Sequence, residues 1–159
     1  MMDPQAKKTA LRMVSYGLYV VTSATADDRG AFLCNWLTQS SFEPPLIVIA
    51  VENEAHSLKV MRAAGRFAVC VLETGQRELS GWFGRHSDKV GDKLANRELM
   101  ATPSGLPLLP EALAWWECTI TAITPSGDHQ LVLAEVIDAG VIREGTPLQL
   151  KETGFRYAG

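Results

Sequence analysis

A histidine stands at the start of an apolar run in the segment SGDHQLVLAEV, Ser126 to Val136. His129 follows a Ser-Gly-Asp turn and is in line with Leu131 and Leu133 along a predicted strand. Imidazole titrates near neutral pH and can donate or accept a proton there. The segment therefore predicts either an acid–base group or a partly solvated histidine at a strand end.

The other residues that bind metals or act as nucleophiles are scattered. The three cysteines and three histidines are Cys34, Cys70, Cys118, His56, His86 and His129. Their spacing contains no zinc or iron–sulfur pattern, so we expect no metal site and three reduced, mostly buried thiols. The sequence also contains no dinucleotide GxGxxG motif after a strand, no P-loop and no GxSxG elbow.

The first half of the chain predicts the elements that would position a site. Asp3-Pro4 is typical of a helix start, and the Pro-Pro pair after Glu43 rules out helix. A hairpin of Leu18 to Thr25 and Ala31 to Ser41 is expected next, followed by a strand from Leu46 to Val51 that is covered on both faces. A helix from Glu54 to Ala64, capped by Asn53, and a buried strand from Arg66 to Glu73 are expected after it.

The second half predicts mostly strands. Thr74 to Asn96 is broken by glycines and predicts two short helices with a mobile linker. A long strand from Ala112 to Thr124, a turn at 125–128, a second long strand to Ile142 and a short strand near Pro147 to Lys151 are expected to follow. We therefore expect one domain, residues 1–159, that is mainly β with peripheral helices, its antiparallel strands closing into a barrel.

Composition excludes several classes of protein. The 159 residues are 47% hydrophobic and 21% charged, as in a globular domain, and the formal net charge is −3. No basic run predicts nucleic-acid binding, and no stretch reaches the roughly 20 apolar residues of a membrane span. With no apolar leader at the N-terminus, we expect a cytoplasmic protein.

Four segments resemble one known family. They are GAFLCNWLTQSSFEPPLIVIAV (30–51), HSLKVMRAAGRFAVCVL (56–72), WFGRHSDK (82–89) and SGDHQLVLAEV (126–136). In this order they resemble the flavin-reductase-like family, and NWLTQSSFEPP with the ending TGFRYAG is similar to the flavin-reductase-like domain of diflavin proteins. The resemblance covers most of the chain and implies an FMN-binding split β-barrel.

A flavin ring needs small polar groups along a strand beside an apolar wall. The polar segment between AFL and LIVIAV has that mixture, and the resemblance implies flavin contacts from Asn35, Trp36, Thr38, Gln39, Ser40 and Ser41. The alternative is an edge strand with one solvated face.

The phosphate of FMN needs hydrogen-bond donors and positive charge, which a helix N-terminus begins to provide. His56, Ser57 and Lys59 lie in the first turns of the predicted helix and are our candidates. By resemblance, Arg85 and Lys89 reach in from the flavin loop and Phe83 packs near the cofactor. The alternative is that the three cationic side chains are ordinary solvated charges.

The resemblance implies an NAD(P)H-dependent flavin reductase, in which His129 at the rim of the site orients the nicotinamide or handles a proton. FMN is the expected cofactor, with FAD possible, and NADH or NADPH is the co-substrate. Two alternatives stay open: an FMN electron carrier reduced by a partner protein without NAD(P)H, and a flavin-free binding module. Partners would be an electron-accepting protein or an oxygenase.

We also expect a homodimer. Small members of the family are usually dimers with the flavin at the subunit contact, and Trp82, Trp115 and Trp116 are candidates for an apolar interface. The alternative for the adjacent pair is that Trp115 and Trp116 point to opposite faces of one strand, one into the core and one to solvent.

Overall fold

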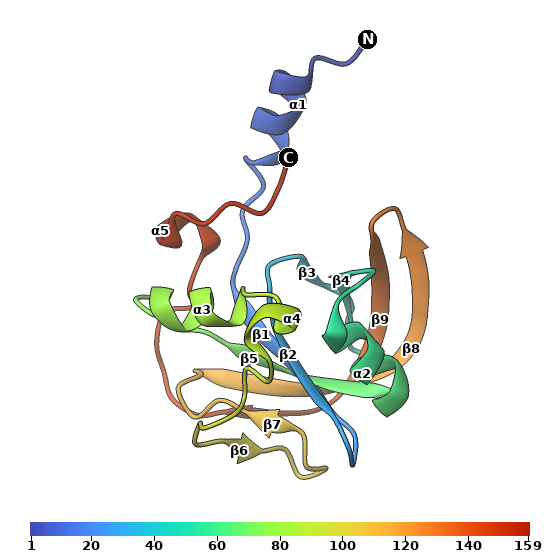
Figure 1. The fold of residues 1–159 in the computed structure, drawn as a ribbon, viewed down its shortest axis with the longest axis vertical. Helices are drawn as coiled ribbons and strands as arrows, with labels where there is room; N and C mark the ends of the chain where they lie inside the picture. Colours follow the sequence, from blue (N-terminus) through green and yellow to red (C-terminus); the bar gives the residue numbers. More distant parts are fainter.

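Seven strands form one antiparallel sheet in the computed structural model, which describes all 159 residues (Figure 1). The strand order is β2-β1-β5-β8-β9-β4-β3. The bounds are β1 Tyr19–Ala24, β2 Arg29–Cys34, β3 Leu37–Ser41, β4 Leu46–Glu52, β5 Arg66–Val71, β8 Ala114–Ser126 and β9 His129–Val141. Two short strands that the sequence did not predict, β6 Met100–Ala101 and β7 Pro107–Leu108, pair separately.

The two end strands of the sheet, β2 and β3, are consecutive in the chain. Only Asn35 and Trp36 join them, yet they do not pair with each other. The sequence predicted one extended run from Ala31 to Ser41, and this was wrong at Asn35-Trp36. The run breaks there because the Trp36 carbonyl accepts a hydrogen bond from Ala50 N on β4 (3.0 Å). The predicted mainly β split barrel is otherwise confirmed.

Strand β5 shows why its sequence is continuously apolar. Phe67 and Val69 point into one core cluster and Ala68 and Cys70 into another, so both faces are buried. Burying a side chain such as Phe67 contributes about 1.5–3 kcal/mol. Strand β4 differs from the prediction, because only Ile47, Ile49 and Val51 are buried and the alternate residues are half-buried.

The predicted reduced thiols and the tryptophan pair can both be located in the core. Cys34, Cys70 and Cys118 are buried and free. Trp115 packs against the cluster that contains Phe83, and Trp116 packs against the cluster that contains Phe67. The pair therefore points to opposite faces of β8, as the alternative predicted. The expected solvent-facing side chain was wrong, because both tryptophans pack against core clusters.

Helix α1 (Pro4–Leu11) extends away from the sheet and buries none of its residues (Figure 1). Its predicted start is confirmed, since the Asp3 side chain accepts a hydrogen bond from Gln5 N (2.9 Å). The chain end returns beside it, where Arg12 Nε donates to the Ala158 carbonyl (3.2 Å).

Helix α2 (His56–Ala64) lies on β1 and β2 and ends, as predicted, at Gly65 with φ 69°. Its predicted cap was wrong, because the N-cap residue is Ala55. Asn53 instead donates to the Gly127 carbonyl (3.0 Å) and accepts from Gln130 Nε2 (2.8 Å). The Asn53 side chain therefore fastens the tip of the β8–β9 hairpin to β4.

The remaining helices are short: α3 Arg77–Phe83, α4 Ser87–Val90 and α5 Leu150–Thr153. The first two confirm the helices predicted within 74–96. The strand expected near Pro147 to Lys151 was wrong, since only single bridges form at Pro147 and Gln149 before the chain turns into α5. The Glu152 carboxylate accepts from Gln149 N (3.0 Å) and so stabilises this turn. No helix has the length and apolar character needed to cross a membrane.

Candidate functional site

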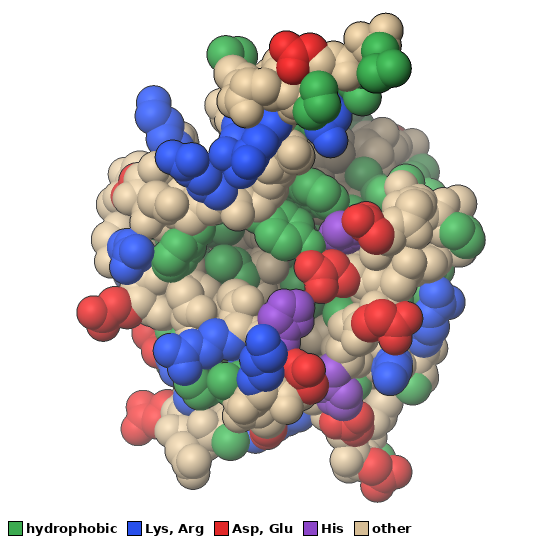
Figure 2. Space-filling model, turned by 45° about the horizontal axis from the view of Figure 1, so that its top comes forward, with side chains coloured by type: hydrophobic (Ala, Val, Ile, Leu, Met, Phe, Trp, Pro, Cys, Tyr) green, Lys and Arg blue, Asp and Glu red, His purple; other side chains and the backbone are tan.

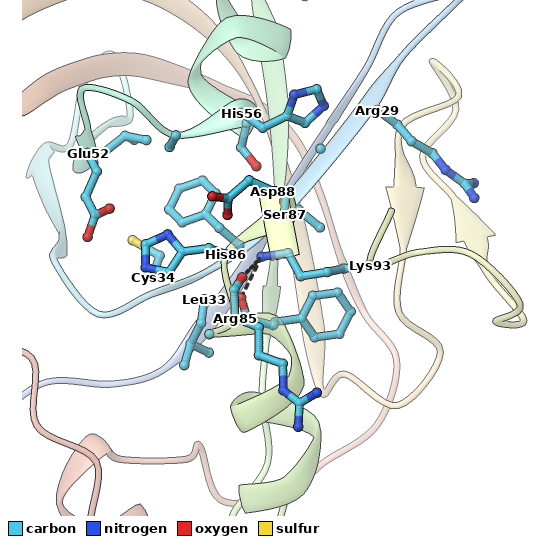
Figure 3. A pocket seen from close by; sticks show the side chains of 18 of the residues that line it. Arg29, Leu33, Cys34, Glu52, His56, Arg85, His86, Ser87, Asp88 and Lys93 are labelled. Atoms are coloured by element: carbon cyan, nitrogen blue, oxygen red, sulfur yellow. Dashed lines mark hydrogen bonds between the residues drawn. The ribbon is translucent and has the colours of Figure 1, made fainter. Parts of the chain in front are cut away.

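One face of the molecule is hollowed by a cavity of about 1200 Å³ (Figures 2 and 3). Hydrophobic side chains lie in the hollow, and histidine, acidic and basic side chains lie around it (Figure 2). Its walls are the β1–β2 hairpin, the start of α2, the loop between α3 and α4, and the C-terminal segment Phe155–Tyr157. The cavity therefore combines an apolar interior with a charged rim.

The start of α2 forms one end of this cavity. Ser57 is 3% exposed, and its hydroxyl makes no hydrogen bond within the chain. No side chain caps the helix, so the first-turn N–H groups have no side-chain partner. Strand β2 approaches closely because of Gly30, where a Cβ atom would lie 2.9 Å from Ser57 Cα. Free donors at a helix N-terminus in a narrow cradle suit a phosphate group.

His56 and Lys59, the other phosphate candidates, also line the cavity. His56 Nε2 lies 3.1 Å from the Asp28 carboxylate, so the imidazole is tied to the β1–β2 turn. Lys59 is exposed and forms no ion pair, which leaves its charge free for a ligand.

The end of α3 and the loop after it bring two predicted residues to the cavity. Phe83 is buried in the cavity wall, and Arg85 lines the cavity with its guanidinium 5.4 Å from the Trp82 ring centroid. Lys89, by contrast, is exposed on α4 and does not line the cavity. A part in binding for Lys89 stays a prediction.

A further cation of the cavity wall is Lys93, which the sequence interpretation missed. It is 4% exposed and has no carboxylate partner, and its ammonium donates to the Phe83 carbonyl (2.9 Å) and the Arg85 carbonyl (2.7 Å) (Figure 3). Burial lowers the pKa of Lys93 to about 8. Lys93 therefore fixes the loop and places a buried cation beside the cavity.

The polar segment 35–41 is divided between two places. Asn35 lines the cavity, and its amide donates to the Tyr157 carbonyl (3.2 Å). Thr38, Gln39, Ser40 and Ser41 lie on β3, outside the cavity lining. The Thr38 and Gln39 side chains bond to backbone carbonyls of the same strand. A role for these four residues in flavin binding stays a prediction.

His129 lies behind the cavity wall and does not line it. Its ring packs against Trp36, with centroids 4.7 Å apart, and its Nε2 lies 2.9 Å from the Tyr157 hydroxyl. Tyr157 and Glu52 are the cavity-lining residues here, and the Tyr157 hydroxyl donates to Glu52 Oε1 (2.5 Å). A catalytic role for His129 stays a prediction, and any effect of its ring on the cavity passes through Tyr157.

Lys93, Glu52 and Tyr157 are thus the site residues that sequence reasoning did not find. Lys93 stands in Gly-Asp-Lys-Leu, where a lysine followed by the buried Leu94 was the only available signal. Glu52 ends an apolar strand, and Tyr157 is three residues from the end of the chain. Neither position has a local pattern that indicates chemistry.

Comparison with known proteins places the chain in the flavin reductase-like domain family. The family described as flavin reductase like domain matches residues 11–159. Diflavin flavoprotein A 1 of Synechocystis sp. is 30% identical over 151 residues, which are 93% of this chain and 26% of that protein. The reductase subunit HsaB of a flavin-dependent monooxygenase from Mycobacterium tuberculosis is 31% identical over 134 residues, 84% of this chain and 70% of that subunit.

A solved structure shares both fold and sequence. The NADH:FAD oxidoreductase SgcE6 of Streptomyces globisporus has a TM-score of 0.77 and 32% identity, covering 89% of this chain and 86% of that chain. The chain spans only about a quarter of the diflavin flavoprotein, 26% of its length.

Proposed function

The chain belongs to the flavin reductase-like domain family, and from this premise we propose that it is an NAD(P)H-dependent flavin reductase that binds FMN in the cavity. The observation that carries the proposal is the uncapped start of α2 with the free Ser57 hydroxyl held against Gly30. The phosphate would bind there, and Lys59 would add positive charge.

The volume of the cavity supports a site that takes a flavin and a nicotinamide together. Its volume of about 1200 Å³ exceeds the roughly 300–1,000 Å³ typical of a site for one small ligand. When bound, the flavin supplies the hydride-accepting chemistry. The chain's contribution is to orient both rings, with Asn35 and Phe83 lining the cavity, and to exclude water. FAD is the alternative cofactor, since SgcE6 is named an NADH:FAD oxidoreductase.

The reduced flavin would pass electrons to an oxygenase or to another accepting protein. HsaB, a relative of this chain, is the reductase subunit of a flavin-dependent monooxygenase.

Two measurements separate this proposal from its alternatives. Mixing the purified protein with FMN and recording its visible spectrum after gel filtration tests cofactor binding, and a colourless protein would favour a flavin-free module. Stopped-flow mixing of the FMN-loaded protein with NADH and NADPH then tests the reaction. We expect the flavin absorbance to bleach on a catalytic timescale, whereas a bound flavin that neither nucleotide reduces would favour an electron carrier.

We also propose that the protein is a homodimer. Support comes from exposed apolar side chains on and after α1, namely Leu11, Met13 and Val14, and from a shallow apolar groove lined by Trp36 and Leu131. Such surfaces are commonly covered in an oligomer. Sedimentation equilibrium is expected to give twice the chain mass of 17.3 kDa, and a monomer at micromolar concentration would refute the dimer.

A further inference from the structure

Four side chains form one hydrogen-bonded chain at the wall of the cavity. Asp128 Oδ1 lies 2.5 Å from His129 Nδ1, and His129 Nε2 lies 2.9 Å from the Tyr157 hydroxyl. The Tyr157 hydroxyl in turn donates to Glu52 Oε1 (2.5 Å). Register in the sheet fixes this arrangement, because His129 pairs directly with Glu52 across β9 and β4.

The donors and acceptors of this chain determine how many protons His129 holds. Burial, followed by the hydrogen bond to Glu52, raises the pKa of the Tyr157 hydroxyl, which therefore keeps its proton. Since that proton is donated to Glu52, the Tyr157 oxygen must accept from His129 Nε2.

The other ring nitrogen is also a donor. The Asp128 carboxyl is exposed to solvent, so it is ionised at neutral pH and only accepts hydrogen bonds. His129 Nδ1 must then carry a proton as well. With a donor at each nitrogen, the hydrogen-bond geometry is that of a ring holding two protons, which lies directly against one carboxylate and is linked through Tyr157 to a second.

The two ends of the chain lie in different surroundings. The Asp128 side chain is 94% exposed to solvent, whereas the His129 side chain is 11% exposed and is covered by the Trp36 ring. Tyr157 and Glu52 line the cavity. Cys34, which also acts on Tyr157, is a neutral thiol because burial raises its pKa to about 12. No lysine or arginine forms an ion pair with Asp128 or Glu52.

We propose that His129 is a proton store for the cavity, and that Tyr157 relays its Nε2 proton to Glu52 on the cavity wall. Reduction of a flavin by NAD(P)H moves one hydride with its two electrons, and the neutral reduced product needs one further proton. Release of that proton leaves His129 neutral, with its Nδ1 proton still bound to Asp128. The ring regains a proton at Nε2 from solvent after the cavity is vacated. Tyr157 is thus a positioning and relay residue, and this use of the proton rests on the proposed function.

The protonation of His129 is testable without flavin or nicotinamide. Long-range ¹H–¹⁵N NMR of the full chain labelled in its three histidines reports whether each ring nitrogen carries a proton. His129→Gln identifies the signal, and His56 and His86 are internal references. At pH 7.5 we expect both nitrogens of His129 to be protonated. An Nε2 without a proton would overturn the proposal.

Substitutions along the chain give a response that a merely structural residue would not give. A hydrogen bond to a charged group stabilises it by roughly 1.5 kcal/mol or more, so Tyr157→Phe should lower the ratio of doubly to singly protonated His129 about tenfold. Glu52→Gln should act in the same direction. Tyr19→Phe is the matched control, because the Tyr19 hydroxyl makes no hydrogen bond and lies outside the cavity lining. An equal ratio in the wild type and Tyr157→Phe would refute the relay.

The use of the proton is tested by stopped-flow reduction of bound FMN with NADH. Proton transfer by a positioned group is commonly worth 10²-fold or more, so Tyr157→Phe and Glu52→Gln should slow reduction at least tenfold while Tyr19→Phe does not. Unchanged rates with an intact imidazolium signal would refute the relay alone. A wild-type protein that NADH does not reduce would instead refute the proposed function.

Discussion

Removal of one hydroxyl, by Ser57→Ala, separates flavin binding from folding. The Ser57 hydroxyl lies at the uncapped start of α2, lines the cavity and has no hydrogen-bond partner in the chain. The fold therefore loses no hydrogen bond when the oxygen is removed. A phosphate bound at this place would lose one charge-assisted hydrogen bond.

The expected magnitude follows from that difference. A hydrogen bond to a charged group contributes about 1.5–3 kcal/mol, which corresponds to a roughly 10- to 150-fold increase in the Kd for FMN. The melting temperature of the flavin-free protein should stay within about 1 °C of the wild type, because a kcal/mol in a chain of this size is worth roughly 2–4 °C.

The assay is a titration of FMN fluorescence quenching with wild type and variant. Ser23→Ala is the matched control, since the buried Ser23 hydroxyl donates to the Arg66 carbonyl (2.8 Å) and does not line the cavity. It should lower the melting temperature by roughly 2–4 °C and leave the Kd unchanged. If Ser57→Ala binds FMN as tightly as the wild type, the phosphate is not at α2.

Three further predictions follow from the same geometry. Gly30→Ala places a Cβ atom 2.9 Å from Ser57 Cα, so α2 must shift. We expect the free energy of unfolding in urea to fall by about 1–3 kcal/mol and FMN to bind more weakly. An unchanged urea midpoint would contradict the close approach of β2 to α2. Burial lowers the pKa of Lys93 to about 8, below the value in the unfolded chain, so the unfolded chain binds more protons between about pH 8 and 10.5. Calorimetry should therefore show that the wild type gains stability over this range relative to Lys93→Met, by at most about 1.4 kcal/mol per pH unit. A wild type that loses stability relative to the variant as the pH rises would contradict this sign. Asn53→Ala removes the hydrogen bonds to Gly127 and Gln130 and should lower the free energy of unfolding by about 1 kcal/mol without shortening α2. A drop in helix content by circular dichroism would instead indicate that Asn53 caps the helix, as the sequence predicted.

The sequence predicted the strands whose environment is uniform. Strand β5 is buried on both faces, so every residue from Phe67 to Cys70 is apolar, and the pattern can be recognised without tertiary information. The turn between β8 and β9 was equally clear, because Gly127 takes φ 65°, which favours glycine. These elements account for three of the seven strands of the sheet, β5, β8 and β9.

Features that depend on distant contacts were not predictable. Asn53 is a good N-cap residue by type, and only the position of the β8–β9 hairpin shows that its amide bonds Gly127 and Gln130 instead. The Asn35-Trp36 break is decided by a bond to Ala50 from another strand. The local sequence pattern does not show when a hydrogen bond to a distant residue replaces the one that the pattern predicts.

The same distinction applies to the site. Ser57, His56, Phe83 and Arg85 all line the cavity. The first two were predicted because a helix start has a recognisable chemistry, and the other two because the flavin-loop resemblance included them. Lys93 resembles a surface lysine until the loop folds over its ammonium. Tyr157 reaches His129 across 28 positions of sequence, so only the structure shows that the two form one chain.

A crystal structure of the protein grown with FMN tests the central claim most directly. The account predicts the ring in the cavity between β2 and the loop after α3, with the phosphate within hydrogen-bond distance of Ser57 Oγ and the first N–H groups of α2. A phosphate bound elsewhere, or a ring outside this cavity, would contradict it.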